Sequence, residues 1–226
     1  MTFPVGSYTL YNNFENCPHK AWHMYVLKDL PRVETPEMKW GNDVHSALEH
    51  RIGKGTPLPD NMTAAEPLAA KLASLPDDFP LRVEYKLGMK ADGTACDFFA
   101  TAVWFRGKVD VAIRVPEMKA AWIIDWKTGK PREEPFELET NALLLKVAHP
   151  DIETVVGEYF WMKEGRAGHR YTLNQWGNTF GRLQTLRTEM EVLHERGEPW
   201  PKRKNPLCGW CPVVSCEHNT SEKRRK

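Results

Sequence analysis

The stretch GKVDVAIRVPEMKAAWIIDWKTG, residues 107–129, decides the fold. Its two apolar halves predict a β-hairpin that turns just after Glu117. In an antiparallel hairpin with this turn, Asp110 lies directly opposite Asp125. Lys127 projects from the same side of its strand as Asp125, because strand side chains alternate between the two faces. Two carboxylates and an amine are therefore expected to converge on one face of the hairpin.

The other face of the predicted hairpin is apolar. An unbroken apolar surface of this size must be core, and a shift of one residue would expose it to water. Hydrophobicity alone therefore specifies the register. The residues of this face are Val109, Val111, Ile113, Val115, Trp122, Ile124 and Trp126.

The converging acids favour a metal site. Cross-strand Cβ atoms lie about 5 Å apart, and two carboxylates at that distance repel each other unless a cation or a proton lies between them. Mg²⁺ and Mn²⁺ prefer such oxygen ligands. The alternative from these residues alone is a surface cluster in which Lys127 neutralises Asp110 and Asp125.

The order of the motifs resembles the PD-(D/E)xK nuclease superfamily, and within it the RecB-like and Cas4-like exonucleases. Asp110 in Gly-x-x-Asp matches the first acid of that family, and Asp125-Trp-Lys127-Thr-Gly matches its Asp-x-Lys-Thr-Gly signature. His45, in a predicted helix over 36–52, resembles the helical Gly-x-x-x-His element. The resemblance implies an α/β fold over 1–226, a single domain with a restriction-endonuclease-like core whose central mixed β-sheet is flanked by helices.

The resemblance also implies a function. It is that of a divalent-metal-dependent DNA exonuclease, a hydrolase of phosphodiester bonds in DNA recombination, DNA repair or phage DNA processing. Asp110 and Asp125 would hold Mg²⁺ or Mn²⁺, with His45 and the backbone carbonyl of Trp126 as further ligands. Lys127 would orient or deprotonate the attacking water. The expected partner is DNA, with linear or single-stranded ends. A helicase or a recombination protein as a second partner is compatible with this function.

One family element departs from its usual form. The helix that usually reads Gln-Leu-x-x-Tyr-Ala reads Glu137-Leu-Glu-Thr-Asn141-Ala here. Glu137 would then enlarge the metal site, or the chain would be a catalytically weakened subunit that binds DNA or assembles a complex. Glu84, on the polar side of an alternating strand, either faces the site, as an acid on the first strand often does in this family, or is solvated.

The cysteines suggest a second metal site. Cys208, Cys211 and Cys216 form a C-x2-C-x4-C motif, and Cys17 supplies a fourth thiol. Four thiolates suit a tetrahedral zinc or a cubane cluster, and the resemblance to Cas4-like and AddB-like nucleases implies a 4Fe-4S cluster joining residues 1–30 to 200–220. The alternatives are Zn²⁺, with a histidine replacing one thiol, or buried free thiols, and Cys96 is expected to be a core residue.

Composition is that of a globular chain. The 226 residues carry 31 Lys and Arg against 30 Asp and Glu, so a DNA-binding surface must be local. No run of about 18 apolar residues predicts a membrane span, and the N-terminus does not resemble a secretory signal, so we expect a cytoplasmic protein with no membrane partner. Candidate DNA contacts are Lys108, Lys130 and Arg132, besides other surface cations. The tail 221–226 is basic, and the aromatic run 96–105 predicts a strand.

Overall fold

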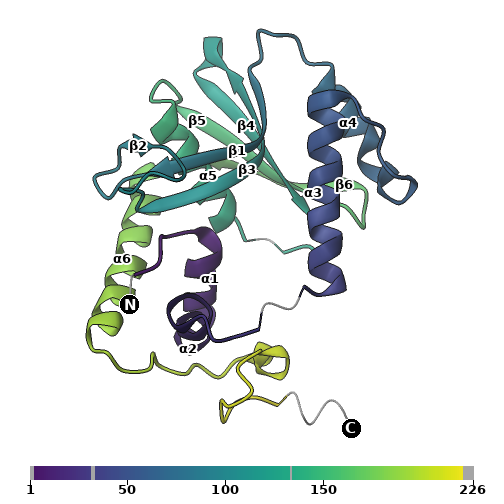
Figure 1. Cartoon of the computed structure of the whole chain (residues 1–226). Helices are drawn as coiled ribbons and strands as arrows, with labels where there is room; N and C mark the ends of the chain where they lie inside the picture. The colour runs from purple at the N-terminus through teal and green to yellow at the C-terminus, as the bar shows by residue number, and fades with distance from the viewer. Residues whose placement is uncertain (1–2, 32–33, 133, 221–226) are drawn as a thin grey trace. The chain divides into compact units, whose positions relative to one another are not determined.

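A computed structural model describes residues 3–31, 34–132 and 134–220 (Figure 1). The basic tail 221–226 lies outside the described residues. The chain forms two compact units. The sheet unit comprises residues 34–180, and the terminal unit comprises residues 1–33 with 181–226. The sequence-based expectation of one nuclease domain stays a prediction.

The sheet unit is built on six strands in the order β2-β1-β3-β4-β5-β6. Strands β4 and β5 pair in parallel and the other neighbours are antiparallel, so the sheet is mixed as expected. With helices on its faces, the unit has the α/β character that the sequence predicts. The strands are β1 (Leu81–Met89), β2 (Ala95–Cys96), β3 (Phe105–Val115), β4 (Ala120–Lys127), β5 (Thr154–Trp161) and β6 (Arg166–Leu173).

The hairpin of β3 and β4 has the predicted register. Val111 pairs with Ile124, and the pairing continues in step to Val115 and Ala120. The turn is a 3-10 helix over Pro116–Met118. This register places Asp110 across from Asp125, one position beyond the last paired residues.

Helices cover both faces of the sheet. Ile124 belongs to a buried cluster with Val44 and Leu48 of α3 (Pro36–Lys54), which also includes residues of α4 (Glu66–Ala73). Its neighbour Ile123 projects to the opposite face, because successive strand residues alternate. On that face Ile123 lies next to Gly157. A Cβ added to Gly157 would lie 3.2 Å from Ile123 and 3.4 Å from Leu138 of α5 (Phe136–Ala148), so α5 packs closely on this face. Figure 1 shows α3 and α4 together on one side of the strands.

Helix α3 has clear sequence signals at both ends. Thr35 accepts a hydrogen bond from the Met38 amide at 3.2 Å, and Pro36 occupies the first turn, where its missing N–H costs nothing. The helix ends at Gly55, whose φ of 72° is the left-handed conformation that glycine adopts without strain. The apolar stripe of α3 faces the sheet, and this packing fixes the position of His45 within the helix.

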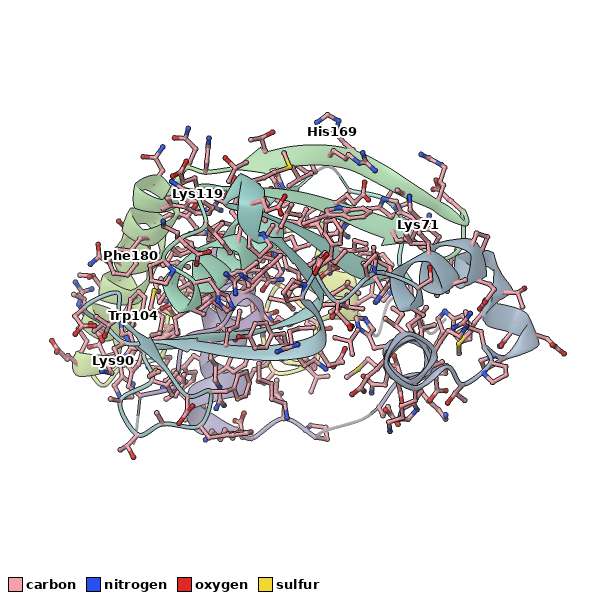
Figure 2. The ribbon with its side chains drawn as sticks, turned by 90° about the horizontal axis from the view of Figure 1, so that it is seen from above. Lys71, Lys90, Trp104, Lys119, His169 and Phe180 are labelled. Carbon is pink, nitrogen blue, oxygen red and sulfur yellow. The ribbon has the colours of Figure 1, made fainter. Side chains whose placement is uncertain are left out.

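The prediction of a strand over 96–105 is wrong. Strand β2 contains only Ala95 and Cys96, which pair with Met89 and Gly88, and a loop follows. Strand β1 is paired along its length with β3, so a long neighbouring strand would need the other edge of β1. An added Cβ on Gly88 would lie 2.9 Å from the Cys96 and Asp97 carbonyl oxygens, so the chain crosses β1 closely and then leaves it. Trp104 of this loop packs against Phe180, with ring centroids 5.7 Å apart (Figure 2).

The terminal unit joins the two ends of the chain. The amide of His19 donates to the Pro201 carbonyl at 3.0 Å, and Asn205 Nδ2 donates to the Asn16 carbonyl at 2.9 Å. The aromatic rings of Phe14 and the buried Trp200 also meet edge to face. Its elements are α1 (Tyr8–Asn16), α2 (Pro18–Ala21), a π-helix (Trp22–Leu27), the part of α6 (Trp176–Glu195) from Gly181 onward and a 3-10 helix (Pro206–Trp210).

No helix within the described residues has both the length and the apolar character that crossing a bilayer requires.

Candidate metal centre

Three side chains from three elements meet in the sheet unit. His45 comes from α3, Glu84 from β1 and Asp110 from β3. His45 Nδ1 lies 3.2 Å from Asp110 Oδ1 and 3.6 Å from Glu84 Oε1. One potential ligand atom from each residue lies within 4.8 Å of the other two. We call these residues the histidine group, and among the described residues they are the only set of three or more His, Cys, Asp or Glu side chains this close.

Glu84 reaches the group through an unusual backbone. Its φ is 51°, in the left-handed region that side chains other than glycine rarely adopt. The pairing of β1 with β3 runs from Val83 opposite Val111 to Tyr85 opposite Val109, with Glu84 unpaired between them. Such a conformation costs on the order of 1 kcal/mol and persists only where surrounding structure imposes it. With this backbone, the Glu84 carboxylate lies 3.6 Å from His45 Nδ1.

A second set of charges lies beside the histidine group. Lys127 Nζ lies 2.6 Å from Asp125 Oδ2 and 2.7 Å from Glu137 Oε2. Asp125 and Lys127 are on β4 and Glu137 is in the first turn of α5. We call these three residues the lysine group. The predicted convergence of Asp125 and Lys127 is thus observed, and Glu137 joins the lysine, not the histidine group.

Burial and charge shift the pKa values of the site. Burial would lower the pKa of His45, but hydrogen bonds to Asp110 and Glu84 and the charges of Asp110 and Asp125 outweigh it and raise the pKa to about 10. Burial also raises the pKa of Asp125 well above its ordinary value, against the opposing charge of Lys127. For Lys127, burial is outweighed by the carboxylates of Asp125 and Glu137, which raise its pKa above the ordinary value. The site holds an excess of acids over cations.

The donor set suits a divalent cation. Asp125 is 5% exposed, and apart from its ion pair with Lys127 no hydrogen-bond donor from the described part of the chain reaches its Oδ2. Asp110, 6% exposed, accepts a hydrogen bond from the Trp126 amide through Oδ2 at 2.9 Å, which holds Oδ1 toward His45. Carboxylate oxygens and one imidazole nitrogen are ligands that Mg²⁺ and especially Mn²⁺ accept. The backbone carbonyl of Trp126 as a further ligand stays a prediction.

A cavity of about 390 Å³ opens beside the histidine group. Three of its lining residues, Asn42, Ser46 and Glu49, were not expected from the sequence, although Asn42 and Glu49 lie three and four residues from His45 and so share its helix face. Lys108 lines the same cavity and makes an ion pair with Glu84. The other predicted DNA contacts, Lys130 and Arg132, are exposed in the segment between β4 and α5. The lining residues are Asn42, His45, Ser46, Glu49, Glu84, Lys108 and Asp110.

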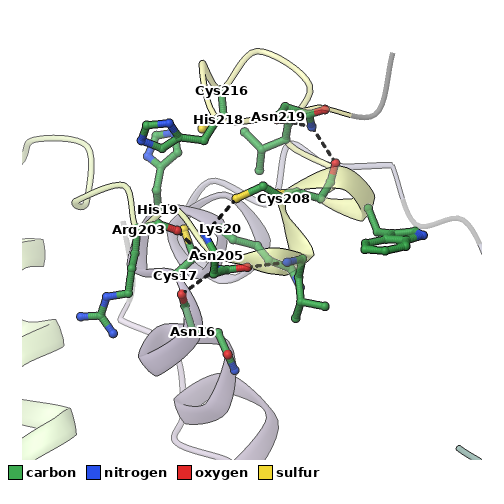
Figure 3. A pocket seen from close by; sticks show the side chains of 14 residues that line it. Asn16, Cys17, His19, Lys20, Arg203, Asn205, Cys208, Cys216, His218 and Asn219 are labelled. Carbon is green, nitrogen blue, oxygen red and sulfur yellow. Dashed lines mark hydrogen bonds between the residues drawn. The ribbon is translucent and has the colours of Figure 1, made fainter. Parts of the chain in front are cut away.

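The four predicted cysteine ligands share a pocket in the terminal unit. Cys17, Cys208, Cys211 and Cys216 all line a cavity of about 250 Å³ (Figure 3). None of them forms a disulfide. Within the described residues, no three of their sulfur atoms lie within 4.8 Å of one another, as the ligand atoms of the histidine group do. Cys96 lies in the sheet unit and does not line this pocket, and it is half-buried, not fully buried as a core residue would be.

Other groups complete the cysteine pocket. The Asn205 amide donates to Cys208 Sγ at 3.4 Å, and His19 and His218, the alternative zinc ligands, also line the cavity. Burial raises the pKa of the Cys211 thiol and lowers the pKa of His19, although the bond of His19 to the Trp200 carbonyl opposes the latter shift. Both shifts favour the neutral forms of these side chains.

Comparison with known proteins gives a fold and no family. No family model matches the chain, and no curated protein matches it. Among solved structures, the chain is similar to the crystal structure of a protein called SSO0001, with a TM-score of 0.55 and 16% identity. The similarity covers 97% of this chain and 89% of that one. At this identity the likeness concerns the fold alone.

Proposed function

We propose that the protein is a metal-dependent DNA exonuclease of the RecB-like group in the PD-(D/E)xK superfamily. The observation that carries this proposal is that the histidine group and the lysine group lie side by side over three neighbouring strands of one mixed sheet. Five of these six side chains, all but Glu137, belong to the motifs or to the strand position on which the resemblance to that family rests. The α/β architecture is compatible with a restriction-endonuclease-like core.

The residues divide the work of hydrolysis between them. His45, Glu84, Asp110 and Asp125 would hold a divalent cation, which supplies a Lewis acid for a phosphate oxygen and lowers the pKa of a water. Asp110 is positioned for this by the Trp126 amide, which fixes the orientation of its carboxylate. Glu84 is positioned by its strained backbone and by Lys108.

Lys127 is better suited to be a cation than a base. Its ammonium lies between two carboxylates at 2.6 and 2.7 Å, and its raised pKa keeps it protonated at neutral pH. A protonated lysine can donate hydrogen bonds to the attacking water and offset negative charge that develops on the phosphate. Of the two sequence-based roles, orienting the water therefore fits better than deprotonating it.

A second candidate function is a weakened subunit that binds DNA and retains the nuclease fold. The contact between Glu137 and Lys127 favours it, because the carboxylate neutralises the charge that the lysine would otherwise offer to phosphate. The buried acids Asp110 and Asp125 oppose it, since an inactive protein gains nothing from keeping two repelling carboxylates.

A DNA digestion assay tests the proposal. Labelled linear and circular DNA are incubated with the purified protein and Mg²⁺ or Mn²⁺, in parallel with Lys127→Ala. We expect the wild type to degrade linear DNA and spare circular DNA, with the rate reduced about 100-fold or more in the variant. Binding of DNA without digestion by either protein would instead support the second candidate, and degradation by both proteins equally would point to a contaminating nuclease.

Metal binding should release protons. Because the pKa of His45 is about 10 without metal, its imidazole is protonated at neutral pH and must lose that proton to become a ligand. Apparent Mn²⁺ affinity should therefore rise about tenfold per pH unit between pH 6 and 8 from this group alone. Calorimetric titration in two buffers of different ionisation enthalpy measures the protons released, and we expect about one or more per Mn²⁺.

His45→Gln serves as the matched variant for that measurement. It retains a polar side chain but has no proton to lose, so proton release should fall by about one per Mn²⁺ and affinity should weaken. Equal proton release by the wild type and the variant would contradict the assignment of His45 as a ligand.

We further propose that the cysteine pocket holds a 4Fe-4S cluster, with Zn²⁺ as the alternative. Four thiols from the two ends of the chain line one cavity, and a cluster there would close a loop of nearly the whole chain. By loop-closure reasoning such a link stabilises the folded state by several kcal/mol, on the order of 4 to 5. Its role would be structural.

Anaerobic purification tests the cluster. We expect a brown protein with absorption near ~400 nm and about four irons and four sulfides per chain. Cys208→Ser should lose this absorption and unfold at a lower temperature, whereas Cys96→Ser, a cysteine outside the pocket, should keep both properties. A colourless wild type with one Zn²⁺ per chain would support the alternative, and a protein with neither metal would contradict both.

A further inference from the structure

A row of cations leads away from the histidine group along β3. Arg106, Lys108 and Asp110 are alternate residues of this strand, so Lys108 is about 7 Å and Arg106 about 13 Å along the strand from Asp110. Lys108 lies directly opposite Lys86 on β1. Like charges in such a cross-strand pair repel each other. This part of the sheet is therefore suited to a bound anion that lies along it.

Two of these cations lack acidic partners. Glu84 makes an ion pair with Lys108. Across residues 3–31, 34–132 and 134–220, no carboxylate lies within ion-pair distance of Lys86 or Arg106. Their charged groups instead lie over aromatic rings: Lys86 Nζ is 5.6 Å from the centre of Phe99, and the Arg106 guanidinium is 5.8 Å from it.

The aromatic rings belong to the loop that replaces the predicted strand. Phe98 and Phe99 meet edge to face, with centroids 4.9 Å apart, and the Arg106 guanidinium is 4.7 Å from the Phe98 ring. Arg106 also donates to the Phe98 carbonyl at 3.2 Å, which ties the loop to β3. Phe99 is nevertheless 74% exposed. A ring that is held by these neighbours and still has most of its surface in solvent is available for stacking.

We infer that Phe99, with Lys86 and Arg106, binds the single-stranded DNA segment next to the phosphate that is cleaved at the histidine group. Single-stranded segments are bound by combining cations for the backbone with aromatic rings for the bases, and duplex DNA does not offer the faces of its bases. The cations fit phosphates by charge, and the ring fits a base by shape. This inference rests on the proposed function for the identity of the substrate.

Binding without metal separates this inference from the proposed activity. Anisotropy of a fluorescein-labelled oligothymidylate is measured at low salt in EDTA, so no hydrolysis is needed. Phe99→Ala should weaken binding about tenfold or more, and Phe99→Trp should retain it. Met118→Ala is the matched control, because Met118 is also 74% exposed but lies in the turn between β3 and β4. Its effect should stay below about twofold.

Salt dependence tests the cations. Lys86→Ala should lower the slope of log affinity against log salt concentration by about 0.7, the value for one phosphate contact on a single strand. Lys71→Ala is the control, because it removes the same charge from a distant place. Lys71 is in α4, on the opposite side of Figure 2 from Lys90, which directly follows β1. The slope of this control should not change.

Two results would overturn the inference: no binding of the oligonucleotide by the wild type at low salt, or a Phe99→Ala affinity equal to that of Met118→Ala. Equal weakening of duplex and single-stranded binding by Phe99→Ala would also overturn it, because stacking on a splayed base requires the single strand. If the wild type digests DNA and the Phe99→Ala variant binds the oligonucleotide normally, the proposed function is supported and this inference is rejected. Loss of binding in Phe99→Ala of a protein that does not digest DNA would support the inference and reject the activity.

Discussion

Asp110→Asn is expected to reduce DNA hydrolysis by about 1,000-fold or more while leaving the fold intact, because Asp110 is the shared centre of the site. One of its oxygens accepts the Trp126 amide and the other faces His45. Asparagine has the same shape and can still accept the amide bond. It cannot supply the charge that a cation requires, so Mn²⁺ affinity should fall together with the rate.

The stability of this variant distinguishes a functional acid from a structural one. Asp110 repels Asp125 but attracts the protonated His45, so removing its charge relieves one interaction and weakens the other. The thermal unfolding temperature of the metal-free protein should therefore change by only a few degrees. Asp43→Asn is the control, since Asp43 is exposed on the same helix as His45 and its one ion pair within the described residues is with Lys39 at 2.8 Å. Its rate should stay within about twofold of the wild type. A large loss of stability in Asp110→Asn would show that the acid serves the fold.

The hairpin and its acids could be predicted because the pattern is local. Val111 and Ile124 must be buried, and that requirement fixes the register that brings Asp110 opposite Asp125. His45 required the family motif, since nothing in the periodicity of its helix indicates that a residue of β3 contacts it. For Glu84 the sequence left two positions open, facing the site or facing solvent. The left-handed backbone at this residue cannot be predicted, because an alternating strand sequence contains nothing that indicates it.

The aromatic run near β2 does not form the predicted strand, for a physical reason. Aromatic residues suit strands where they can be half-buried, but the pairing edge that remains on β1 accommodates only two residues here. Phe99 therefore stands in solvent at 74% exposure. The contact of Glu137 with Lys127 was missed as well, because it depends on how α5 packs on the sheet after a loop.

Lys127→Met should destabilise the metal-free protein by about 3 kcal/mol at pH 8, because it leaves the carboxylates of Asp125 and Glu137 without their cation in a mostly buried site. For a chain of this length, that loss corresponds to a decrease of about 6 to 12 °C in the unfolding temperature. The pKa of Asp125 is already raised, and losing Lys127 raises it further. An acid with a raised pKa in the folded state destabilises the fold as pH rises, so the loss should be smaller near pH 5.

A double variant and a control variant test this explanation. Lys127→Met with Glu137→Gln should recover about half of the lost stability, because one of the two uncompensated charges is gone. Lys119→Met is the control: Lys119 and Glu153 form a pair with the same 2.7 Å separation, but both side chains are more than half exposed, so the change should stay within about 0.5 kcal/mol. Equal losses of stability in Lys127→Met and Lys119→Met would contradict the claim that burial makes the Lys127 ion pairs stronger than an exposed pair.

Added Mn²⁺ connects this stability experiment with the proposed chemistry. If the acids of the site hold a divalent cation, Mn²⁺ should stabilise the Lys127→Met protein more than the wild type, because the ion supplies the positive charge that the substitution removed. The Asp110→Asn protein should show little of this stabilisation. A shift of equal size in all three proteins would place the ion elsewhere. The same carboxylates would then be explained by their ion pair with Lys127 alone, and the hydrolytic role would lose its physical basis.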